Sequence, residues 1–314
     1  MLLIATALVA SFAPSRFPVN VYIEDTDAFS IVFYANYLKF WERATVAALG
    51  SAKINKLLRE DDMLFGVQQA HGMRYSNPAV LGDSCEATIE PLGIDSEGRL
   101  AVKAAMIRDG KELITCADLR FGFVSRKSGQ RVTDWGLQEA MSLLELDVPG
   151  DPCAADDVSN PPAAGTSPPL SDGALVLQLD EASIGGSLTL HGVLRYFERH
   201  RTTFLGGPSG LQALSDAGVS VVVGRVNNLR LLDAAYQVGV GEEVELRCRP
   251  VLKARNTQIV FEQWLTKPDG TPLARGDVAV VCLDVAAGKM CAAPPAALEV
   301  VQEWLAKQAE AQAA

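Results

Sequence analysis

Residues 21–50 read VYIEDTDAFSIVFYANYLKFWERATVAALG, and they carry the most informative pattern of the chain. Residues 19–24 alternate apolar and polar side chains, which is the period-two pattern of a half-buried strand. From Asn36 onward the apolar residues follow a helical period, and they are Tyr37, Phe40, Trp41, Ala44 and Ala48. Asn36 belongs to the residue types that cap a helix N-terminus, and Gly50 to those that end a helix. The stretch therefore predicts a strand, a short loop that carries carboxylates, and a helix whose N-terminus faces that loop.

The same stretch resembles the opening of hotdog-fold thioesterases of the 4-hydroxybenzoyl-CoA thioesterase family. The matching residues are Tyr22, Asp25, Thr26, Asp27, Val32, Tyr34, Asn36, Tyr37, Leu38, Glu42 and Arg43. The pattern extends over about 25 residues with fixed internal spacing, which makes it more specific than a single short motif. A second block, residues 75–78 followed by Gly82-Asp83, resembles a downstream segment of the same family that enters the next strand. The resemblance implies an α+β hotdog fold, in which a curved antiparallel sheet wraps one long helix, and an enzyme that hydrolyses thioesters.

Composition limits the possible functions. The chain has 314 residues, of which 48% are apolar, and this is enough for two ordinary domains with their own cores. Its formal net charge of −10 argues against a nucleic-acid partner, because phosphate binding needs clustered positive charge. The six cysteines show no CxxC spacing, so we expect neither a disulfide framework nor a zinc site. The resemblance implies no metal and no redox cofactor.

The N-terminal segment, residues 1–16, is mostly apolar and has no basic start. It is too short to span a bilayer, which takes about 20 residues, so we expect no membrane span. It can be the apolar region of a cleaved signal, and residues 10–14 (ASFAP) resemble the cleavage signature of plastid signals in algae with secondary plastids. An apolar N-terminus without a targeting role explains the pattern equally well, so plastid and cytoplasmic locations both stay open.

The rest of the first half predicts a second, more polar helix and then several strands. The helix is expected at 51–64 and the strands at 66–75, 84–92, 99–108 and 112–124. Asp109-Gly110 separates the last two strands and is a strong hairpin signal, because both residues tolerate positive φ. This order is the one expected of a hotdog domain, which we place at 17–148. Residues 149–173 are rich in Pro, Gly, Ser and Asp and are interpreted as a linker without regular structure.

The pattern of the first half returns beyond the linker. Residues 194–199 (LRYFER) repeat residues 38–43 (LKFWER) 156 positions later, and two further landmarks, Gly241-Glu242 and Asp269-Gly270, repeat Gly82-Asp83 and Asp109-Gly110 at offsets of 159 and 160. Landmarks at a nearly constant offset indicate an internal duplication. We therefore expect a second hotdog domain at 174–295, paired with the first as a pseudo-dimer within one chain, with the two sheets joined edge to edge. The C-terminal segment, residues 296–314, is expected to be a helix with Leu298, Val301, Trp304 and Leu305 on one face.

Thioester hydrolysis needs a group that activates water or attacks directly, together with donors that stabilise negative charge on the carbonyl oxygen. By resemblance, Asp27 is the catalytic carboxylate and acts either as a general base or as a nucleophile. The resemblance also assigns the backbone N–H of Tyr34 to the thioester carbonyl. First-turn N–H groups lack intrahelical partners, and the helix dipole favours developing negative charge, which agrees with that assignment. The expected substrate-binding residues are Tyr34, Ala35, Phe29 and Asn36.

Two departures from the family pattern affect the expected site. The family has small residues and a glycine after the catalytic Asp, whereas this chain has Ala28-Phe29-Ser30. Phe29 is expected to narrow the acyl pocket or to displace the loop, and Ser30 lacks the easy access to positive φ that glycine has. In the second repeat Ser183 replaces Asp27 and Leu190 replaces Tyr34. We therefore expect one live site, in the first repeat, with the second repeat as its structural partner.

The sequence thus predicts an acyl-CoA thioesterase, and two alternatives stay open. One is an acyl carrier protein (ACP) thioesterase, which a basic patch near the pocket mouth would favour because carrier proteins are acidic. The other is a non-catalytic protein that binds acyl thioesters. A homodimer of the double unit is a further expectation from the resemblance.

Some polar side chains of the second helix are weaker candidates. Arg195, Arg199 and Arg201 can hold the phosphates of CoA, but the expected role is a solvated helix face with weak ion pairs. His200 falls on the apolar face and is expected to be a core histidine. A surface or capping role is expected for His191 at the start of the helix.

Overall fold

The computed structural model describes residues 14–27, 30–95, 97–132, 161, 175–183, 186–253 and 256–313. The elements of the first repeat are β1 (Ser15–Asn20), the 3-10 helix η1 (Ile23–Asp25), α1 (Asn36–Leu49), α2 (Ser51–Glu60), β2 (Met63–Tyr75), β3 (Ser84–Ile94), β4 (Leu100–Arg108) and β5 (Glu112–Ser125). Those of the second are β6 (Leu175–Val176), η2 (Leu179–Glu181), α4 (Leu190–Phe204), α5 (Gly207–Asp216), β7 (Val219–Leu231), η3 (Asp233–Gln237), β8 (Glu243–Lys253), β9 (Gln258–Thr266), β10 (Pro272–Asp284), β11 (Lys289–Cys291) and α6 (Pro295–Ala313). The second repeat follows the order of the first and adds η3, β11 and α6.

The named strands form one antiparallel sheet that runs through both repeats. It has 11 strands in the order β1-β3-β4-β5-β2-β7-β10-β9-β8-β6, with β11 beside β10. The strand order of the second repeat, read outward from β7, matches that of the first repeat, read outward from β2. In the β2–β7 pair Gln69 lies opposite Arg230 and Met73 opposite Val226. The α+β tandem hotdog fold, with the two sheets joined edge to edge, is therefore confirmed.

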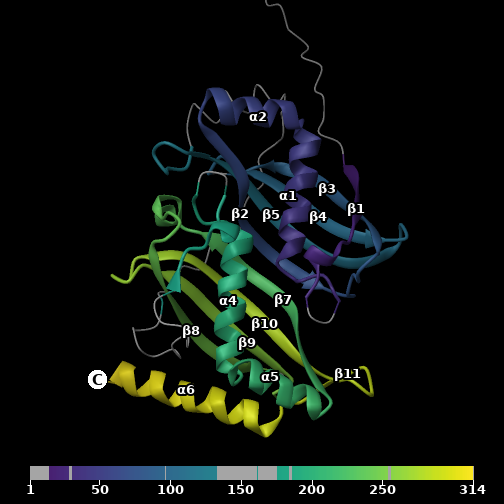
Figure 1. Cartoon of the computed structure of the whole chain (residues 1–314), viewed down its shortest axis with the longest axis vertical. Coiled ribbons are helices and arrows are strands. Elements are labelled where there is room, and N and C mark those ends of the chain that lie inside the picture. Colours follow the sequence, from purple (N-terminus) through teal and green to yellow (C-terminus); the bar gives the residue numbers. More distant parts are fainter. Residues whose placement is uncertain are drawn as a thin grey trace, which may run out of the picture.

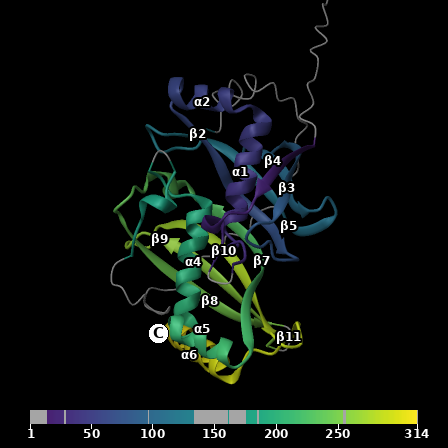
Figure 2. The same cartoon turned by 45° about the vertical axis from the view of Figure 1, so that its right-hand side comes forward.

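Helices α1 and α4 lie next to each other on one face of this sheet, each over the strands of its own repeat (Figures 1 and 2). Each helix buries an aromatic face with helical spacing, and the largest of these side chains are Trp41 on α1 and Tyr196, Phe197 and Phe204 on α4. The buried apolar residues form one cluster that extends through both repeats. Burying a side chain of this size stabilises the fold by about 1.5–3 kcal/mol, so the shared core binds the two repeats into one unit.

The start of the first repeat differs from the sequence-based prediction. The strand predicted at 19–24 is wrong, because β1 already ends at Asn20 and the chain then turns into η1. The carboxylate of Asp25 accepts from the Tyr22 N–H at 3.0 Å and stabilises this turn. The prediction that Asn36 is the N-cap of α1 is also wrong, since the cap is Ala35 and the Asn36 amide donates instead to the Asp25 carbonyl at 3.0 Å. Because β1 begins at Ser15, the boundary predicted at residue 16 lies inside a strand.

Most other local predictions are confirmed. Gly50, at φ 95°, ends α1, and α2 follows it at once. Asp109 and Gly110 have φ of 52° and 69°, as the two central positions of the predicted hairpin require. The C-terminal helix α6 packs Val301 and its predicted apolar neighbours against the core. His200 is fully buried, as expected.

Several predictions fall on parts of the chain that lie outside the described residues. They are the apolar run 1–13, Phe29, and the linker at 149–173 apart from Pro161. Within the described part of the chain, no helix has the length and apolar character needed to cross a membrane.

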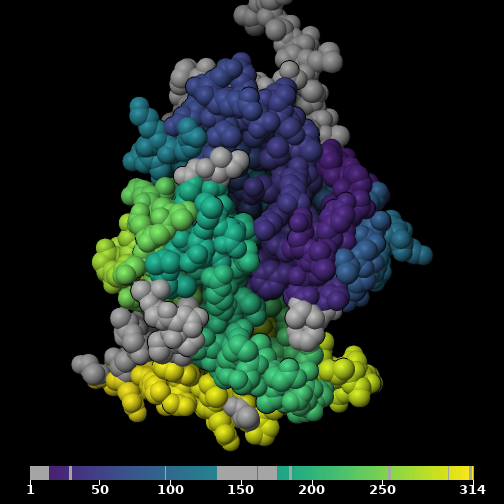
Figure 3. Space-filling view, in the orientation of Figure 1, coloured from purple at the N-terminus to yellow at the C-terminus, as the bar shows by residue number. Residues whose placement is uncertain are grey.

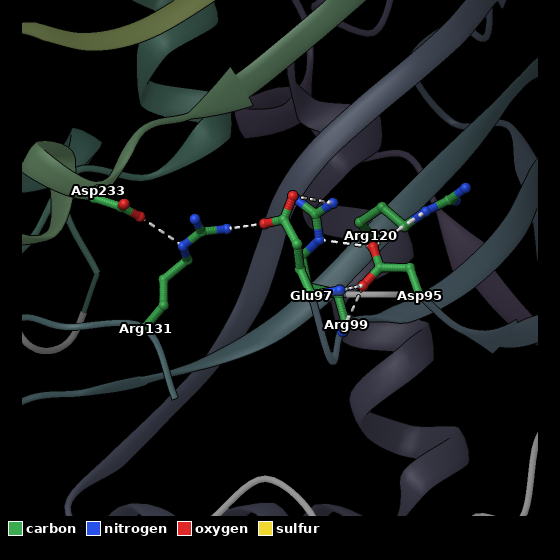
Figure 4. Close-up of polar contacts among 6 residues, drawn as sticks. All are labelled: Asp95, Glu97, Arg99, Arg120, Arg131 and Asp233. Carbon is green, nitrogen blue, oxygen red and sulfur yellow. Dashed lines mark hydrogen bonds and ion pairs between the residues drawn. The ribbon is translucent and has the colours of Figure 1, made fainter. Parts of the chain in front are cut away.

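A chain of charged side chains crosses from the first repeat to the second (Figure 4). Arg99 Nε donates to Asp95 Oδ2 at 2.8 Å, and Glu97 pairs with both Arg99 and Arg131. Arg131 Nε then donates to Asp233 Oδ1 at 2.7 Å, and Asp233 belongs to η3 of the second repeat. The Asp95–Arg99 end is buried and the Asp233 carboxylate is exposed. Loss of one partner at the buried end leaves an uncompensated charge, whereas the exposed pair contributes little to stability.

The loop between η1 and α1 provides the first prediction. Ser30 has φ 58° and the equivalent Gly186 has φ 81°, so both occupy the left-handed region. Because a residue with a Cβ is strained there by about 1–2 kcal/mol, Ser30→Gly should raise the free energy of unfolding by up to about 1 kcal/mol. Gly186→Ser should lower it by about 1 kcal/mol, since an added Cβ meets no described atom within 4 Å and only the backbone strain remains. Urea unfolding midpoints measure both effects, and a destabilised Ser30→Gly variant would contradict the account of this loop.

Candidate active site

Asp27 lies on a narrow loop that backbone hydrogen bonds hold closed. Its N–H donates to the Ile31 carbonyl at 2.9 Å, and the Ser30 N–H donates to the Asp27 carbonyl at 3.0 Å. Thr26 and Val32 form a β-bridge at the base of the loop. Asp27 itself is half-buried. The backbone therefore fixes the position of the predicted catalytic carboxylate just before the start of α1.

The loop is anchored to the segment that precedes β3. The Val32 N–H donates to the Ala79 carbonyl at 2.8 Å, and the Leu81 N–H donates to the Ser30 carbonyl at 3.0 Å. Arg108 Nη1 donates to Asp83 Oδ2 at 2.6 Å and fixes the end of this segment. The two sequence blocks that carry the family resemblance thus meet in space, and the second block supports the loop of the first.

Tyr34 and Ala35 form the turn that enters α1. Among the residues that the structure describes, no carbonyl accepts from the backbone N–H of either residue. The next donors are already used, because the Asn36 N–H donates to the Phe33 carbonyl at 2.8 Å. Both N–H groups lie at the positive end of the helix dipole, where a developing oxyanion is stabilised. They are therefore the donors that this end of the helix offers to a thioester carbonyl.

The side chain of Tyr34 extends into the second repeat, which sequence analysis did not indicate. Its hydroxyl donates to the Leu194 carbonyl at 2.7 Å and accepts from Arg201 Nη2 at 2.7 Å. Arg201 also donates to Gln263 Oε1 at 2.8 Å and pairs with Glu198. Burial raises the pKa of Tyr34, so the hydroxyl keeps the proton that it donates to Leu194. Through this network Tyr34 joins the start of α1 to the middle of α4.

The arginines of α4 divide into two groups. Arg195 pairs with the exposed Asp180 at 3.0 Å, as expected of a solvated face. Arg199 pairs at 2.6 Å with Glu181, whose carboxylate is buried, so this pair differs from the weak, solvated one that was expected. Arg201 is only 2% exposed and belongs to the buried network, so the prediction that it lies on a solvated face is wrong. A phosphate role for Arg201 is excluded by the same burial.

The second repeat has the same loop with different side chains. The Ser183 N–H donates to the Ser187 carbonyl at 2.7 Å, and the Gly186 N–H donates to the Ser183 carbonyl at 2.8 Å. Ser183 thus takes the place that Asp27 has in the first loop, as the sequence offset predicts. Thr189 caps α4, because its Oγ1 accepts from the Gly192 N–H at 3.2 Å.

A cavity of about 370 Å³ lies at this second loop. Its walls come from α1, α2 and β2 of the first repeat and from residues 182–183 and the start of α4 of the second. Figure 3 shows these parts of the first repeat, in blue, and the second repeat, in teal, meeting on one face of the molecule. Most of the lining is apolar, and the polar side chains are Lys39, Glu42, Arg43, Asn55, Ser183, Thr189 and His191. A largely apolar concave pocket with a few polar groups is typical of ligand sites.

Sequence analysis missed this cavity and the role of Glu42 in it. His191, for which a surface or capping role was expected, is half-buried, and its ring contacts the cap residue Thr189. The signal that the sequence offers is a paired size change between the repeats, with Leu190 in place of Tyr34 and Thr45 in place of Arg201.

Among the described residues no three His, Cys, Asp or Glu side chains are arranged to hold a metal ion.

Comparison with known proteins identifies the family. No family model matches the chain. The acyl-CoA thioesterase YbgC of Haemophilus influenzae is 33% identical over 110 residues, which are 33% of this chain and 80% of that protein. The solved 12:0-ACP thioesterase of Umbellularia californica superposes with a TM-score of 0.61 at 10% identity and covers 85% of this chain and 93% of its own. The solved acyl-ACP thioesterase of Bacteroides thetaiotaomicron superposes with a TM-score of 0.57 at 12% identity and covers 85% of this chain and 97% of its own. Both structures therefore share the fold of this chain. With that fold and with a relative matched over most of its length, the chain belongs to the hotdog-fold acyl-CoA thioesterase family.

Proposed function

We propose that this protein hydrolyses acyl-CoA thioesters at the start of α1, with Asp27 as the catalytic carboxylate. The observation that carries the proposal is the arrangement of the Asp27 loop and the start of α1, in a protein that belongs to the thioesterase family. One tight loop holds Asp27, and the N–H groups of Tyr34 and Ala35, which no described carbonyl engages, follow at the helix N-terminus. A carboxylate beside oriented N–H donors is what acyl transfer to water requires.

The reaction follows from these groups. Asp27 either removes a proton from the attacking water or attacks the thioester carbon itself, giving an anhydride that water then opens. In both routes negative charge develops on the carbonyl oxygen, and the N–H groups of Tyr34 and Ala35 stabilise it together with the helix dipole. In the general-base route the carbon–sulfur bond breaks after water has added, whereas in the nucleophilic route it breaks as the anhydride forms, before water opens the anhydride. In both routes the CoA thiolate leaves and takes up a proton. The acid and the free thiol are the products.

The second repeat completes this site, although Ser183 gives it no equivalent carboxylate. The backbone carbonyl of Tyr34 accepts a hydrogen bond from the Tyr75 hydroxyl at 3.1 Å. The side-chain hydroxyl of Tyr34 is held by the Leu194 carbonyl and Arg201 of α4. These contacts fix the peptide whose N–H faces the thioester. Fixed donors need no reorganisation when charge develops, which is why such positioning lowers the barrier.

An acyl carrier protein is the second candidate carrier of the acyl group. The observation in its favour is a cluster of cations where α1 and α4 meet. Burial and then the nearby charges of Arg195 and Arg43 lower the pKa of Lys39. Such a cluster attracts an acidic carrier protein. The assay below therefore includes both carriers, while a plastid location and a homodimer of the double unit stay predictions.

Asp27→Asn tests the proposed function, because asparagine keeps the shape of the side chain and removes the base. We expect thiol release from acyl-CoA and acyl-ACP substrates, aliphatic and aromatic, to fall by about 10²- to 10⁴-fold relative to wild type. Glu24→Gln, which alters an exposed carboxylate of the neighbouring η1, is the matched control and should keep full activity. Equal turnover by wild type and Asp27→Asn would show that another group acts as the base. Intact binding without any turnover by wild type would support the non-catalytic alternative.

Tyr34→Phe separates the two roles assigned to Tyr34. Phenylalanine keeps the backbone N–H but leaves the Leu194 carbonyl without its donor and Arg201 without one acceptor. The free energy of unfolding should therefore fall by about 1–3 kcal/mol, while kcat at a temperature where the variant is folded should change by less than about tenfold. Tyr37→Phe is the control, since among the described residues that hydroxyl only accepts a long hydrogen bond from the Ala79 N–H, at 3.4 Å. A loss of kcat as large as that of Asp27→Asn would mean that the hydroxyl, and not the N–H, acts on the substrate.

A further inference from the structure

The start of α1 meets α4 at what we call the first interface, and the start of α4 meets α1 at the second interface. The cavity lies at the second interface and is the pseudo-symmetric counterpart of the Asp27 site at the first. The offset of 156 positions places Leu190 on Tyr34 and Thr45 on Arg201. At the first interface the two larger side chains meet, with 2.7 Å between the Tyr34 hydroxyl and Arg201 Nη2. At the second, Leu190 is shorter and Thr45 donates to the Trp41 carbonyl of its own helix at 2.8 Å. These substitutions leave space between α1 and the start of α4, where the cavity lies.

His191 supplies this cavity with a hydrogen-bond acceptor. The single hydroxyl hydrogen of Thr189 is donated to the Glu181 carbonyl at 2.7 Å. The 2.9 Å contact between Thr189 Oγ1 and His191 Nδ1 therefore requires the imidazole proton on Nδ1. Nε2 then carries a lone pair, and this buried atom has no partner among the described residues. Burial lowers the pKa of His191 to about 3, so the ring stays neutral at physiological pH. Such a buried acceptor calls for a donor from a ligand.

Glu42 lines the same cavity from α1. Its Oε2 accepts from the Val67 N–H at 3.3 Å, and burial raises the pKa of its carboxyl group. The equivalent residue at the first interface, Glu198, is paired with Arg201. Because Thr45 stands at the position of Arg201, no described arginine is ion-paired with Glu42 in this way, although the nearby charge of Arg43 offsets part of the effect of burial. The carboxyl group of Glu42 and Nε2 of His191 are thus left able to hydrogen-bond to a ligand in the cavity.

We propose that this second cavity binds an acyl thioester that it does not hydrolyse. The ligand class rests on the proposed function. The acyl chain lies against the apolar side chains of α1, α2 and β2, among them Val46, Leu58 and Phe65. The thioester carbonyl accepts from the N–H groups of Leu190 and His191 at the start of α4, to which no described carbonyl is bonded, whereas the Gly192 N–H already donates to Thr189 Oγ1. An amide N–H of the pantetheine arm donates to His191 Nε2, and Lys39 and Arg43 lie where the phosphates of the carrier can reach them.

Two features select an acyl thioester over a free fatty acid. The pantetheine arm carries amide N–H donors for His191 Nε2, whereas a fatty acid anion has no hydrogen to donate. A carboxylate would also meet the lone pair of Nε2 and the carboxyl group of Glu42. Ser183 occupies the place of Asp27 and carries no carboxylate, so the bound thioester is not hydrolysed there.

The test measures how many ligands the full chain binds. The probe is an acyl-CoA analogue with a methylene between the carbonyl and the sulfur, which cannot be hydrolysed, and the method is isothermal titration calorimetry. We expect two analogues per chain for wild type and one for Val46→Trp, which fills the cavity from α1. Ala47→Trp changes the next, exposed residue of the same helix and should still bind two. His191→Ala should weaken the second site by about tenfold, since one hydrogen bond is lost.

The possible outcomes separate this proposal from the proposed function. One analogue per chain in wild type, unchanged in Val46→Trp, would overturn the second site, and so would equally tight binding of the free fatty acid there. Thiol release that survives Asp27→Asn and disappears when Val46→Trp is added would also overturn it, because the cavity would then be catalytic. Two bound analogues without any thiol release by wild type would instead contradict only the proposed function. Leu58→Trp fills the cavity from α2 and replaces Val46→Trp if that variant does not fold.

Discussion

The antiparallel pairing of β2 with β7 is the constraint on which the rest of the structure depends. Each of these strands would otherwise be an exposed edge with unpaired N–H and C=O groups. Their pairing, with Ala70 opposite Leu229 and Met73 opposite Val226, joins two half-sheets into one. It also brings α1 and α4 next to each other, so that Tyr34 of one repeat can reach Leu194 and the buried Arg201 of the other. The candidate active site is built on this contact between repeats.

Duplication within one chain lets the two interfaces differ, which a homodimer cannot do. In a homodimer every substitution appears in both interfaces. Here the first interface has Asp27 and the Tyr34–Arg201 contact, and the second has Ser183 with a cavity beside Glu42. A carboxylate that hydrolyses and a pocket that only binds place different demands on the side chains around them. In the proposed roles, each interface meets only one of these demands, and the second loop keeps the backbone hydrogen bonds of the first with Ser183 in the place of the carboxylate.

Local sequence signals predicted most of the fold. The helical period from Asn36, the glycine at position 50 and the Asp109-Gly110 hairpin are decided by neighbouring residues, and the structure agrees with all three. The strand predicted at 19–24 failed because a local side-chain bond, from the Tyr22 N–H to the Asp25 carboxylate, outweighs the alternating pattern.

The features of the site that depend on the contact between repeats were not predictable in this way. Arg201 looks like a surface residue in the sequence, and only the pairing of the two repeats shows that it is buried against Tyr34. The orphan Nε2 of His191 likewise follows from a tautomer that the Thr189 contact determines, and no spacing pattern encodes it. The Asp27 motif was identifiable because its residues are close in sequence and the family resemblance covers them.

A crystal structure with a non-hydrolysable acyl-CoA analogue would show whether catalysis belongs to the first repeat. We expect the carbonyl oxygen of the analogue within about 2.7–3.1 Å of the backbone nitrogen of Tyr34 or Ala35. We also expect the Asp27 carboxylate on the side of the carbonyl carbon from which water or the carboxylate itself would attack. An analogue bound only at the start of α4, with its carbonyl remote from Asp27, would contradict the assignment of catalysis to the first repeat.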